Sequence, residues 1–323
     1  METLVSILHI YKYKYNKGVI NMRNIIKDFE VYQVQLKKSN GTIKSYVNEV
    51  ELFTEEFIKG VDELNKIEKI AFAREWLDKM NERYAPGTVN KKMNAILVFG
   101  KYLVKNGHIK ENAFSKIDKV KNNDKKFEVY KDSEIESILQ LLEDKTHRQY
   151  QRHIDQNVMV MWNAMFSIYI NAALRNEEVT RIEINDLDFE TGILLVRCKG
   201  HKGKISHKSK LNKSTLDKVK IWYEIRKAIV VKEGSNLLFV SPLSKKGVTT
   251  NAVRKQMKNL KEELGINNEL MIHSLRHTRI TELVSKGASI EAVSQFAHHS
   301  SISTTERFYI HSNDKMLDEL SNM

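Results

Sequence analysis

The sequence predicts a mainly α-helical protein of two domains, with a small antiparallel β-sheet in the second domain. Apolar residues recur at helical spacing through residues 22–115 and again over most of residues 131–323. The region from Glu183 to His207 instead shows the short apolar runs and glycine turns of strands. Residues 116–130 are charged and nearly free of large apolar side chains, which predicts a linker. At 323 residues, the chain is long enough for a core in each domain.

The first domain should be a small helical bundle. Two helices are predicted from apolar faces, one led by Ile43, Val50 and Phe53 and the next by Ile70 and Trp76. Pro86-Gly87 then marks the start of a further helix, which Asn106-Gly107 ends. Residues 1–21 are treated as an N-terminal extension, because their apolar run has neither a basic start nor a cleavage site.

The second domain should combine helices with a hairpin. A capping box, Ser133 with Glu136, is expected to open its first helix. The apolar window Val158 to Leu174 is interrupted by asparagines and is too short for a bilayer, so we predict a buried helix. Turns are expected at Thr191-Gly192 and within residues 200–203, and helices return from Lys213 onward.

Composition narrows the function class. The formal net charge of +12 favours a polyanionic partner, because clustered Lys and Arg gain affinity by releasing counterions from phosphates. The single cysteine, Cys198, excludes disulfides and a cysteine-built zinc site, and fits a reducing compartment.

The candidate catalytic residues all lie in the second domain, and each one taken alone is weak evidence for a catalytic role. An arginine before an acidic pair usually caps a helix, a His-x-x-Arg pair is usually a polar face, and a lone tyrosine usually packs. The adjacent histidines 298 and 299 lack Asp, Glu or Cys at ligand spacing, so no metal site is predicted. The candidates in chain order are Arg175, Lys199, His273, Arg276, His299 and Tyr309.

Together these residue types suit metal-free phosphoryl transfer through a phosphotyrosine. Two guanidinium groups match the paired non-bridging oxygens of the transition state. A phenol with a pKa near ~10 needs a neighbouring base, for which histidine is the usual choice. A poor alkoxide leaving group needs a proton, which a lysine among other cations can donate.

The second domain closely resembles the tyrosine recombinases, also called the phage integrase family. The resemblance rests on the ordered segments "ALRNEEV", "CKGHKGK", "HSLRHT" and "HHSSISTTERFYIH". Residues 22–115, with "YLVKNGHIKENAFSKI" at their end, resemble the family's SAM-like helical core-binding domain. The resemblance implies a core-binding domain followed by an α+β catalytic domain over residues 131–323.

The resemblance also implies a role for each residue. Arg175 and Arg276 clamp the scissile phosphate, and Lys199 is the general acid toward the 5′-oxygen. His273 serves as acid and base, and His299 donates to a non-bridging oxygen. Tyr309 is the nucleophile that forms a 3′-phosphotyrosyl link. Glu178 is given a structural role.

The chain departs from the family pattern at two places. His298 stands where glycine is usual before the motif histidine; the following "SSISTT" favours His299 as the match and leaves His298 the weaker candidate. The nucleophile more often stands where this chain has Phe308, which has no hydroxyl. Tyr309 must therefore be the nucleophile, or the resemblance fails.

The resemblance implies that the partner is double-stranded DNA at specific core sites and that a homotetramer binds it. It also implies a place in the bacterial cytoplasm, on the nucleoid, and a reaction without cofactor or metal. A stripe of Met316, Leu317 and Leu320 either packs on its own domain or docks on a neighbouring protomer.

Integration, cointegrate resolution and chromosome-dimer separation all stay open. Alternatives are a type IB-like topoisomerase or hairpin resolvase, and a DNA-binding regulator without catalysis. A metal-dependent nuclease is disfavoured by the missing acidic cluster.

Overall fold

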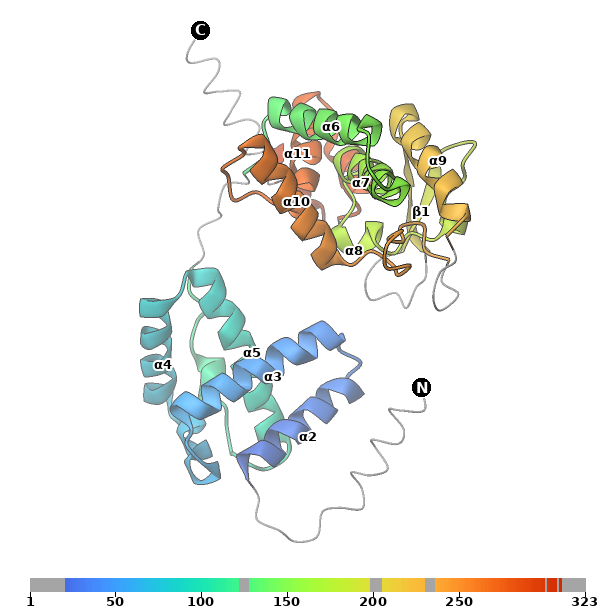
Figure 1. The fold of residues 1–323 in the computed structure, drawn as a ribbon. Coiled ribbons are helices and arrows are strands. Elements are labelled where there is room, and N and C mark those ends of the chain that lie inside the picture. The colour runs from blue at the N-terminus through green and yellow to red at the C-terminus, as the bar shows by residue number, and fades with distance from the viewer. Residues whose placement is uncertain are drawn as a thin grey trace. The chain divides into compact units, whose positions relative to one another are not determined.

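The computed structural model divides into two compact units, Met1–Asp124 and Lys125–Met323 (Figure 1). The structure describes residues 21–121, 128–197, 205–229, 236–299, 301–306 and 308–309, the side chains of 205 and 206 excepted. Within these residues the protein is mainly α-helical, with a two-stranded antiparallel sheet in the second unit. The predicted fold class is confirmed. Of the predicted N-terminal extension, residues 1–20 lie outside the described residues.

The first unit is a bundle of α-helices joined by short 3₁₀ segments. Side chains that accept from backbone N–H groups begin two of these helices, Asn21 before α2 and Ser39 before α3. Pro86 begins α5, where its missing N–H costs no hydrogen bond. The elements are α2 (Met22–Gln35), α3 (Asn40–Phe57), η1 (Val61–Glu68), α4 (Ile70–Arg83), α5 (Pro86–Lys105) and η2 (Ala113–Lys116).

Aromatic packing forms the centre of this bundle. Phe114 meets Phe53 and Trp76 edge to face, with ring centroids 5.7 and 5.4 Å apart. All three side chains are buried, as the helical periodicity predicts for Phe53 and Trp76. The prediction for Ile70 is wrong: this first residue of α4 is 38% exposed.

The second unit is built around α7, which packs against α6, α9 and α11. Helix α7 is the predicted apolar helix, and its last three turns are almost wholly buried. The elements are α6 (Asp132–His147), α7 (His153–Ala172), α8 (Asn176–Val179), η3 (Ile184–Asp186), β1 (Ile193–Arg197), β2 (Ile205–Lys210), α9 (Lys213–Lys227), α10 (Thr250–Leu264), α11 (Ile272–Ser285) and α12 (Ile290–Ala297), and residues 302–306 and 308–309 are also helical.

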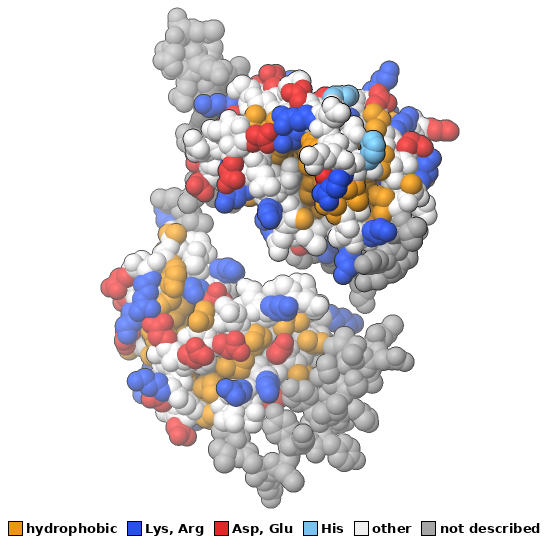
Figure 2. All heavy atoms as spheres, viewed as in Figure 1, with side chains coloured by type: hydrophobic (Ala, Val, Ile, Leu, Met, Phe, Trp, Pro, Cys, Tyr) orange, Lys and Arg blue, Asp and Glu red, His pale blue; other side chains and the backbone are white. Residues whose placement is uncertain are grey.

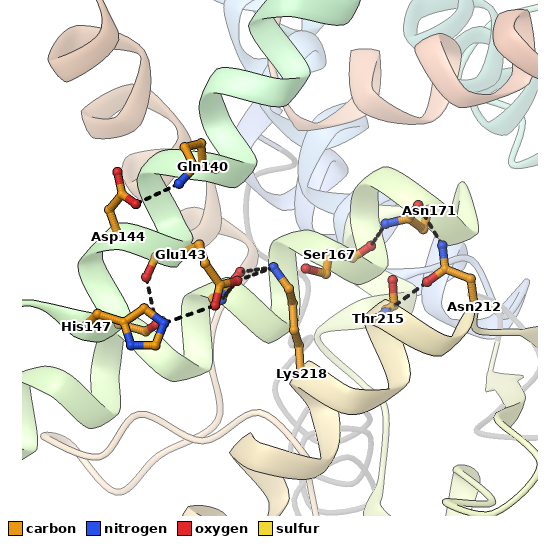
Figure 3. Close-up of polar contacts among 11 residues, drawn as sticks. Gln140, Glu143, Asp144, His147, Ser167, Asn171, Asn212, Thr215 and Lys218 are labelled. Carbon is orange, nitrogen blue, oxygen red and sulfur yellow. Dashed lines mark hydrogen bonds and ion pairs between the residues drawn. The ribbon is translucent and has the colours of Figure 1, made fainter.

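The asparagines that interrupt the apolar run fasten α7 to its neighbours (Figure 3). Buried Asn163 accepts from Lys218 Nζ at 3.1 Å and donates to Glu143 at 3.1 Å. Asn171 accepts at 3.1 Å from Asn212, which also caps α9. Because a buried amide must be hydrogen-bonded, these contacts fix the register of α6, α7 and α9.

The start of α6 differs from the prediction. The helix begins one residue before Ser133, and the Lys131 N–H donates to Glu134 Oε2 at 2.8 Å. Glu134 therefore closes the first turn in place of the expected pair Ser133 and Glu136. Either acidic residue can compensate the exposed N–H groups of the first turn, so the sequence pattern did not separate them.

The hairpin joins β1 to β2 with Ile193 opposite Lys210 and an irregularity between Val196 and Arg197. Gly192, with φ 72°, makes the predicted turn before β1. At the far end of β1, Arg197 binds the buried carboxylate of Asp186, with Nη2 2.6 Å from Oδ1. This ion pair ties β1 to η3.

The surface carries charges of both signs. Lys and Arg side chains are interspersed with Asp and Glu over both units on the face shown in Figure 2. The positive surplus is therefore not gathered into one block on that face. Within the part of the chain that the structure describes, no helix is both long and apolar enough to cross a membrane.

Candidate active site

The candidate site forms where two helices end in left-handed residues. Helix α7 stops at Ala173, with φ 50°, and α12 stops at His298, with φ 53°. The last carbonyls of a helix have no partner inside it and carry a partial negative charge. Cationic side chains are therefore favoured at both helix ends.

Arg276 of α11 joins the two ends. Its guanidinium donates to the carbonyl of Ala173 at 2.5 Å and to the carbonyl of Ala297. The side chain is only 2% exposed, so its charge is held in place by the fold. Arg276 is thus both a buried cation and the link between α7, α11 and α12.

Arg175 reaches the same place from the segment after α7. Its Nη1 donates to Glu178 at 2.9 Å and its Nη2 donates to the carbonyl of His298 at 3.3 Å. Glu178 is buried and also accepts from the Arg175 N–H at 2.7 Å, which fits the structural role expected for it. Since the Arg175 side chain is 40% exposed, its guanidinium can also meet an incoming anion.

His299 follows α12 and is held by a residue that the sequence did not single out. Its Nδ1 lies 2.8 Å from the hydroxyl of Thr305, which is fully buried. Burial, together with the smaller effect of the charges of Arg276 and Arg175, lowers the pKa of His299 to about 4. A neutral ring that accepts from Thr305 carries its proton on Nε2, ready to donate to a phosphate oxygen.

His273 lies one turn before Arg276 on α11, and only part of its side chain is exposed to solvent. Its ring packs edge-on against His277, with centroids 4.4 Å apart, and His277 packs on Phe308. Partial burial, Arg276 and Arg175 lower the pKa of His273, so it is neutral and can accept a proton at neutral pH.

His207 and His298 add an imidazole pair to the site. His207, on β2, stacks face to face on His298, with the ring planes 23° apart. Burial lowers the pKa of His207 to about 4 and of His298 to about 3. The pair is therefore uncharged at neutral pH, beside the charges of Arg175 and Arg276. Sequence spacing could not indicate this contact, because the two residues come from distant segments.

Tyr309 is near the site, but its hydroxyl faces elsewhere. The phenol donates to the carbonyl of Ala288, in the turn between α11 and α12, and the ring packs against the cluster that contains buried Phe308. Partial burial and the charge of Glu291 raise the pKa of Tyr309. The structure thus brings Arg175, Arg276, His273 and His299 together, whereas Tyr309 is bound to a neighbouring turn.

Besides the N-terminal extension, three parts of the sequence prediction lie outside the described residues. These are Lys199, the turn expected within residues 200–203, and the apolar tail with Met316, Leu317 and Leu320. Among the described residues, no group of three or more His, Cys, Asp or Glu side chains is arranged to hold a metal ion.

Comparisons with known proteins identify the family to which the chain belongs. The model of the phage integrase family matches residues 128–316. Tyrosine recombinase XerC of Bacillus subtilis is 26% identical, over 92% of this chain and 94% of that protein. Tyrosine recombinase XerD of Lacticaseibacillus casei is 24% identical, over 92% of this chain and 96% of its own length.

Solved structures share the fold. XerH recombinase bound to palindromic difH substrate superposes with a TM-score of 0.71 and 21% identity, covering 87% of this chain and 79% of that one. The Tn1549 transposon integrase in complex with transposon right end DNA gives a TM-score of 0.67 and 18% identity, covering 92% and 99%.

The fold and the paired arginines with histidines define an enzyme of the tyrosine recombinase class, which carries out site-specific DNA recombination. The chain belongs to the phage integrase family, as the match over residues 128–316 establishes.

Proposed function

We propose that this recombinase cuts and rejoins double-stranded DNA through a 3′-phosphotyrosyl intermediate, with Tyr309 as the nucleophile and without cofactor, metal or ATP. The observation that carries this proposal is the convergence of Arg175, Arg276 and His299 where α7 and α12 end. Three fixed donors at one place suit a pentacoordinate phosphate better than a neutral ligand.

In the proposed reaction, Arg175 and Arg276 bind the non-bridging oxygens and His299 donates to one of them from Nε2. His273 takes the proton of the Tyr309 hydroxyl as the bond from that oxygen to phosphorus forms. The bond from phosphorus to the 5′-oxygen breaks, and Lys199 gives the leaving oxygen its proton. Attack by the 5′-hydroxyl of another strand reverses these steps and restores the tyrosine.

Tyr309 has to change partners before it can attack. Its hydroxyl donates to the carbonyl of Ala288, so this hydrogen bond must break as the phenol turns toward the phosphate. A neutral hydrogen bond of this kind contributes about 1 kcal/mol, which DNA binding can readily offset. We assign the capture of DNA to both units, with the core-binding role on residues 22–115 and the linker over residues 116–130.

The related recombinases in complex with DNA support double-stranded DNA as the partner. We propose a homotetramer on two synapsed core sites, in the cytoplasm and on the nucleoid. In it, the tail bearing Met316, Leu317 and Leu320 docks on the neighbouring protomer. The biological task proposed is integration and excision, or cointegrate resolution, of a mobile element; the Tn1549 integrase has the same fold.

Covalent trapping tests the reaction class. A DNA duplex selected from random sequence by binding to the protein is nicked at successive positions and incubated in EDTA without ATP. Wild type should form a denaturant-resistant adduct that Tyr309→Phe does not form, while Tyr223→Phe, on α9, serves as the matched control. Tight binding with no adduct would favour a regulator. Relaxation of supercoiled DNA that lacks the selected sequence would favour a topoisomerase.

A further inference from the structure

Arg175 lies in the short connection between α7 and α8, residues 173–175. Connections between helices are generally more mobile than the helices, so a functional side chain there needs separate support. The bonds of Arg175 to Glu178 do not supply it, because Glu178 belongs to α8 and moves with the same segment. The position of the guanidinium therefore depends on how the two ends of the segment, Ala173 and Asn176, are fastened to the rest of the unit.

The first end of the segment is fastened to α11. Ala173 is fully buried, and its carbonyl accepts from Arg276 Nη1 at 2.5 Å. The contact of Arg175 Nη2 with the carbonyl of His298 is longer, at 3.3 Å, and leads to the end of α12. Neither of these contacts holds the other end of the segment, at Asn176.

The second end is fastened by the side chain of Asn176. The hydroxyl of Tyr169, in the last turn of α7, donates to Asn176 Oδ1 at 2.8 Å. The amide nitrogen of Asn176 donates at 3.3 Å to the carbonyl of Thr250, the first residue of α10. Since a carbonyl can only accept, the amide nitrogen must face Thr250, which leaves the amide oxygen for the tyrosine. One side chain thus ties the segment to both α7 and α10.

Tyr169 is suited to be a permanent donor. Its side chain is 1% exposed, and Phe166 packs edge-on against its ring with the centroids 6.0 Å apart. Burial raises the pKa of Tyr169 well above its ordinary value, so the hydroxyl keeps its proton throughout the neutral range. Because a buried hydroxyl needs a partner, the ring and the hydrogen bond together fix where Asn176 lies.

We propose that Tyr169 is a positioning residue for phosphate binding: through Asn176, its hydroxyl holds the connection between α7 and α8 so that the Arg175 guanidinium meets the scissile phosphate. This inference rests on the proposed function, in which Arg175 binds a non-bridging oxygen. With Ala173 held by Arg276 and Asn176 held by Tyr169, the arginine stands between two anchored residues.

Removal of a single hydroxyl tests the proposal. Tyr169→Phe keeps the buried ring and deletes only the donor to Asn176. The measurement is the single-turnover rate of adduct formation on the nicked, selected duplex at saturating protein, with the Kd for that duplex measured separately. The rate should fall by about 10- to 100-fold, as small displacements of a catalytic group cause. The Kd should stay within about twofold of wild type, because many other phosphate contacts hold the duplex.

Tyr130→Phe is the matched control. That tyrosine is also buried, at 2% exposure, and its hydroxyl donates to the carbonyl of Leu270 at 2.6 Å. Each variant loses one hydrogen bond of a buried hydroxyl in the second unit, so their urea midpoints should fall by similar amounts. A purely structural role for Tyr169 predicts similar rates for the two variants, and that result would overturn the proposal. The positioning role predicts that only Tyr169→Phe is slow.

Two further variants locate the effect. Asn176→Ala should be at least as slow as Tyr169→Phe, and the double variant no slower than Asn176→Ala, because the same contact is lost in both. Arg175→Lys keeps the positive charge but loses the planar fork that binds paired oxygens. In that background, Tyr169→Phe should change the residual rate by less than about twofold. A full additional loss there would show that the tyrosine does not act through Arg175.

Failure of this inference can be told apart from failure of the proposed function. If wild type forms no adduct, or if Arg175→Lys reacts as fast as wild type, the phosphate-binding role assigned to Arg175 fails. If Arg175→Lys is slow but Tyr169→Phe and Asn176→Ala react at the wild-type rate, only the positioning role of Tyr169 fails.

Discussion

Replacement of Arg276 by alanine should lower the free energy of unfolding of the second unit far more than replacement of an ordinary surface arginine does. The guanidinium is 2% exposed and donates to the carbonyls of Ala173 and Ala297, at the ends of α7 and α12. Arg276→Ala leaves both carbonyls buried without these donors. Hydrogen bonds from a charged group contribute about 1.5–3 kcal/mol each, so the loss of two is expected to cost about 3–6 kcal/mol.

That loss is a large fraction of the roughly 5–15 kcal/mol that stabilises a typical domain. The assay is urea unfolding followed by fluorescence, to which Trp162 and Trp222 of this unit contribute. Arg279→Ala is the control, because Arg279 lies one turn away on α11 and pairs with partly exposed Glu282; its loss should stay below about 1 kcal/mol. Equal, small losses for both variants would refute the reasoning that Arg276 joins the helix ends.

Two other predictions follow from the histidines. In the folded protein the pKa is about 4 for each of His207, His277 and His299, whereas an unfolded histidine has a pKa of about 6.5. As the pH falls below 6.5, the unfolded state therefore takes up protons before the folded state does. Stability measured in urea should drop by about 1 kcal/mol per histidine between pH 7 and pH 5, after discounting for partial exposure; a flat profile contradicts the burial. Thr305→Val keeps the shape but removes the hydroxyl beside His299 Nδ1. Adduct formation should slow about tenfold with unchanged DNA affinity, and an unchanged rate would show that Thr305 does not set the tautomer.

Local pattern was sufficient to predict the helices and the hairpin. The apolar window before Arg175 became buried α7, and the glycine turn before β1 formed at Gly192. These features depend on residues a few positions apart, for which periodicity and turn chemistry are informative. The sequence pattern did not identify which acidic residue closes the first turn of α6, because both Glu134 and Glu136 are suitable; in the structure it is Glu134.

The sequence suggested the residue types of the candidate site but not their geometry. Arg175, Arg276 and His299 lie together where α7 and α12 end, and their shared catalytic role stays a prediction. The supporting contacts were not visible, because the stack of His207 on His298 joins segments that only tertiary packing brings together. Nor could spacing reveal that the Tyr309 hydroxyl donates to the backbone carbonyl of Ala288.

The central claim is that Tyr309 becomes covalently attached to DNA. The most direct measurement is peptide mapping by mass spectrometry of the adduct trapped on a nicked duplex. One modified peptide is expected, carrying a 3′-nucleotide phosphate on the oxygen of Tyr309. Attachment to any other residue, or cleavage that leaves no protein bound to the 3′ end, would contradict it.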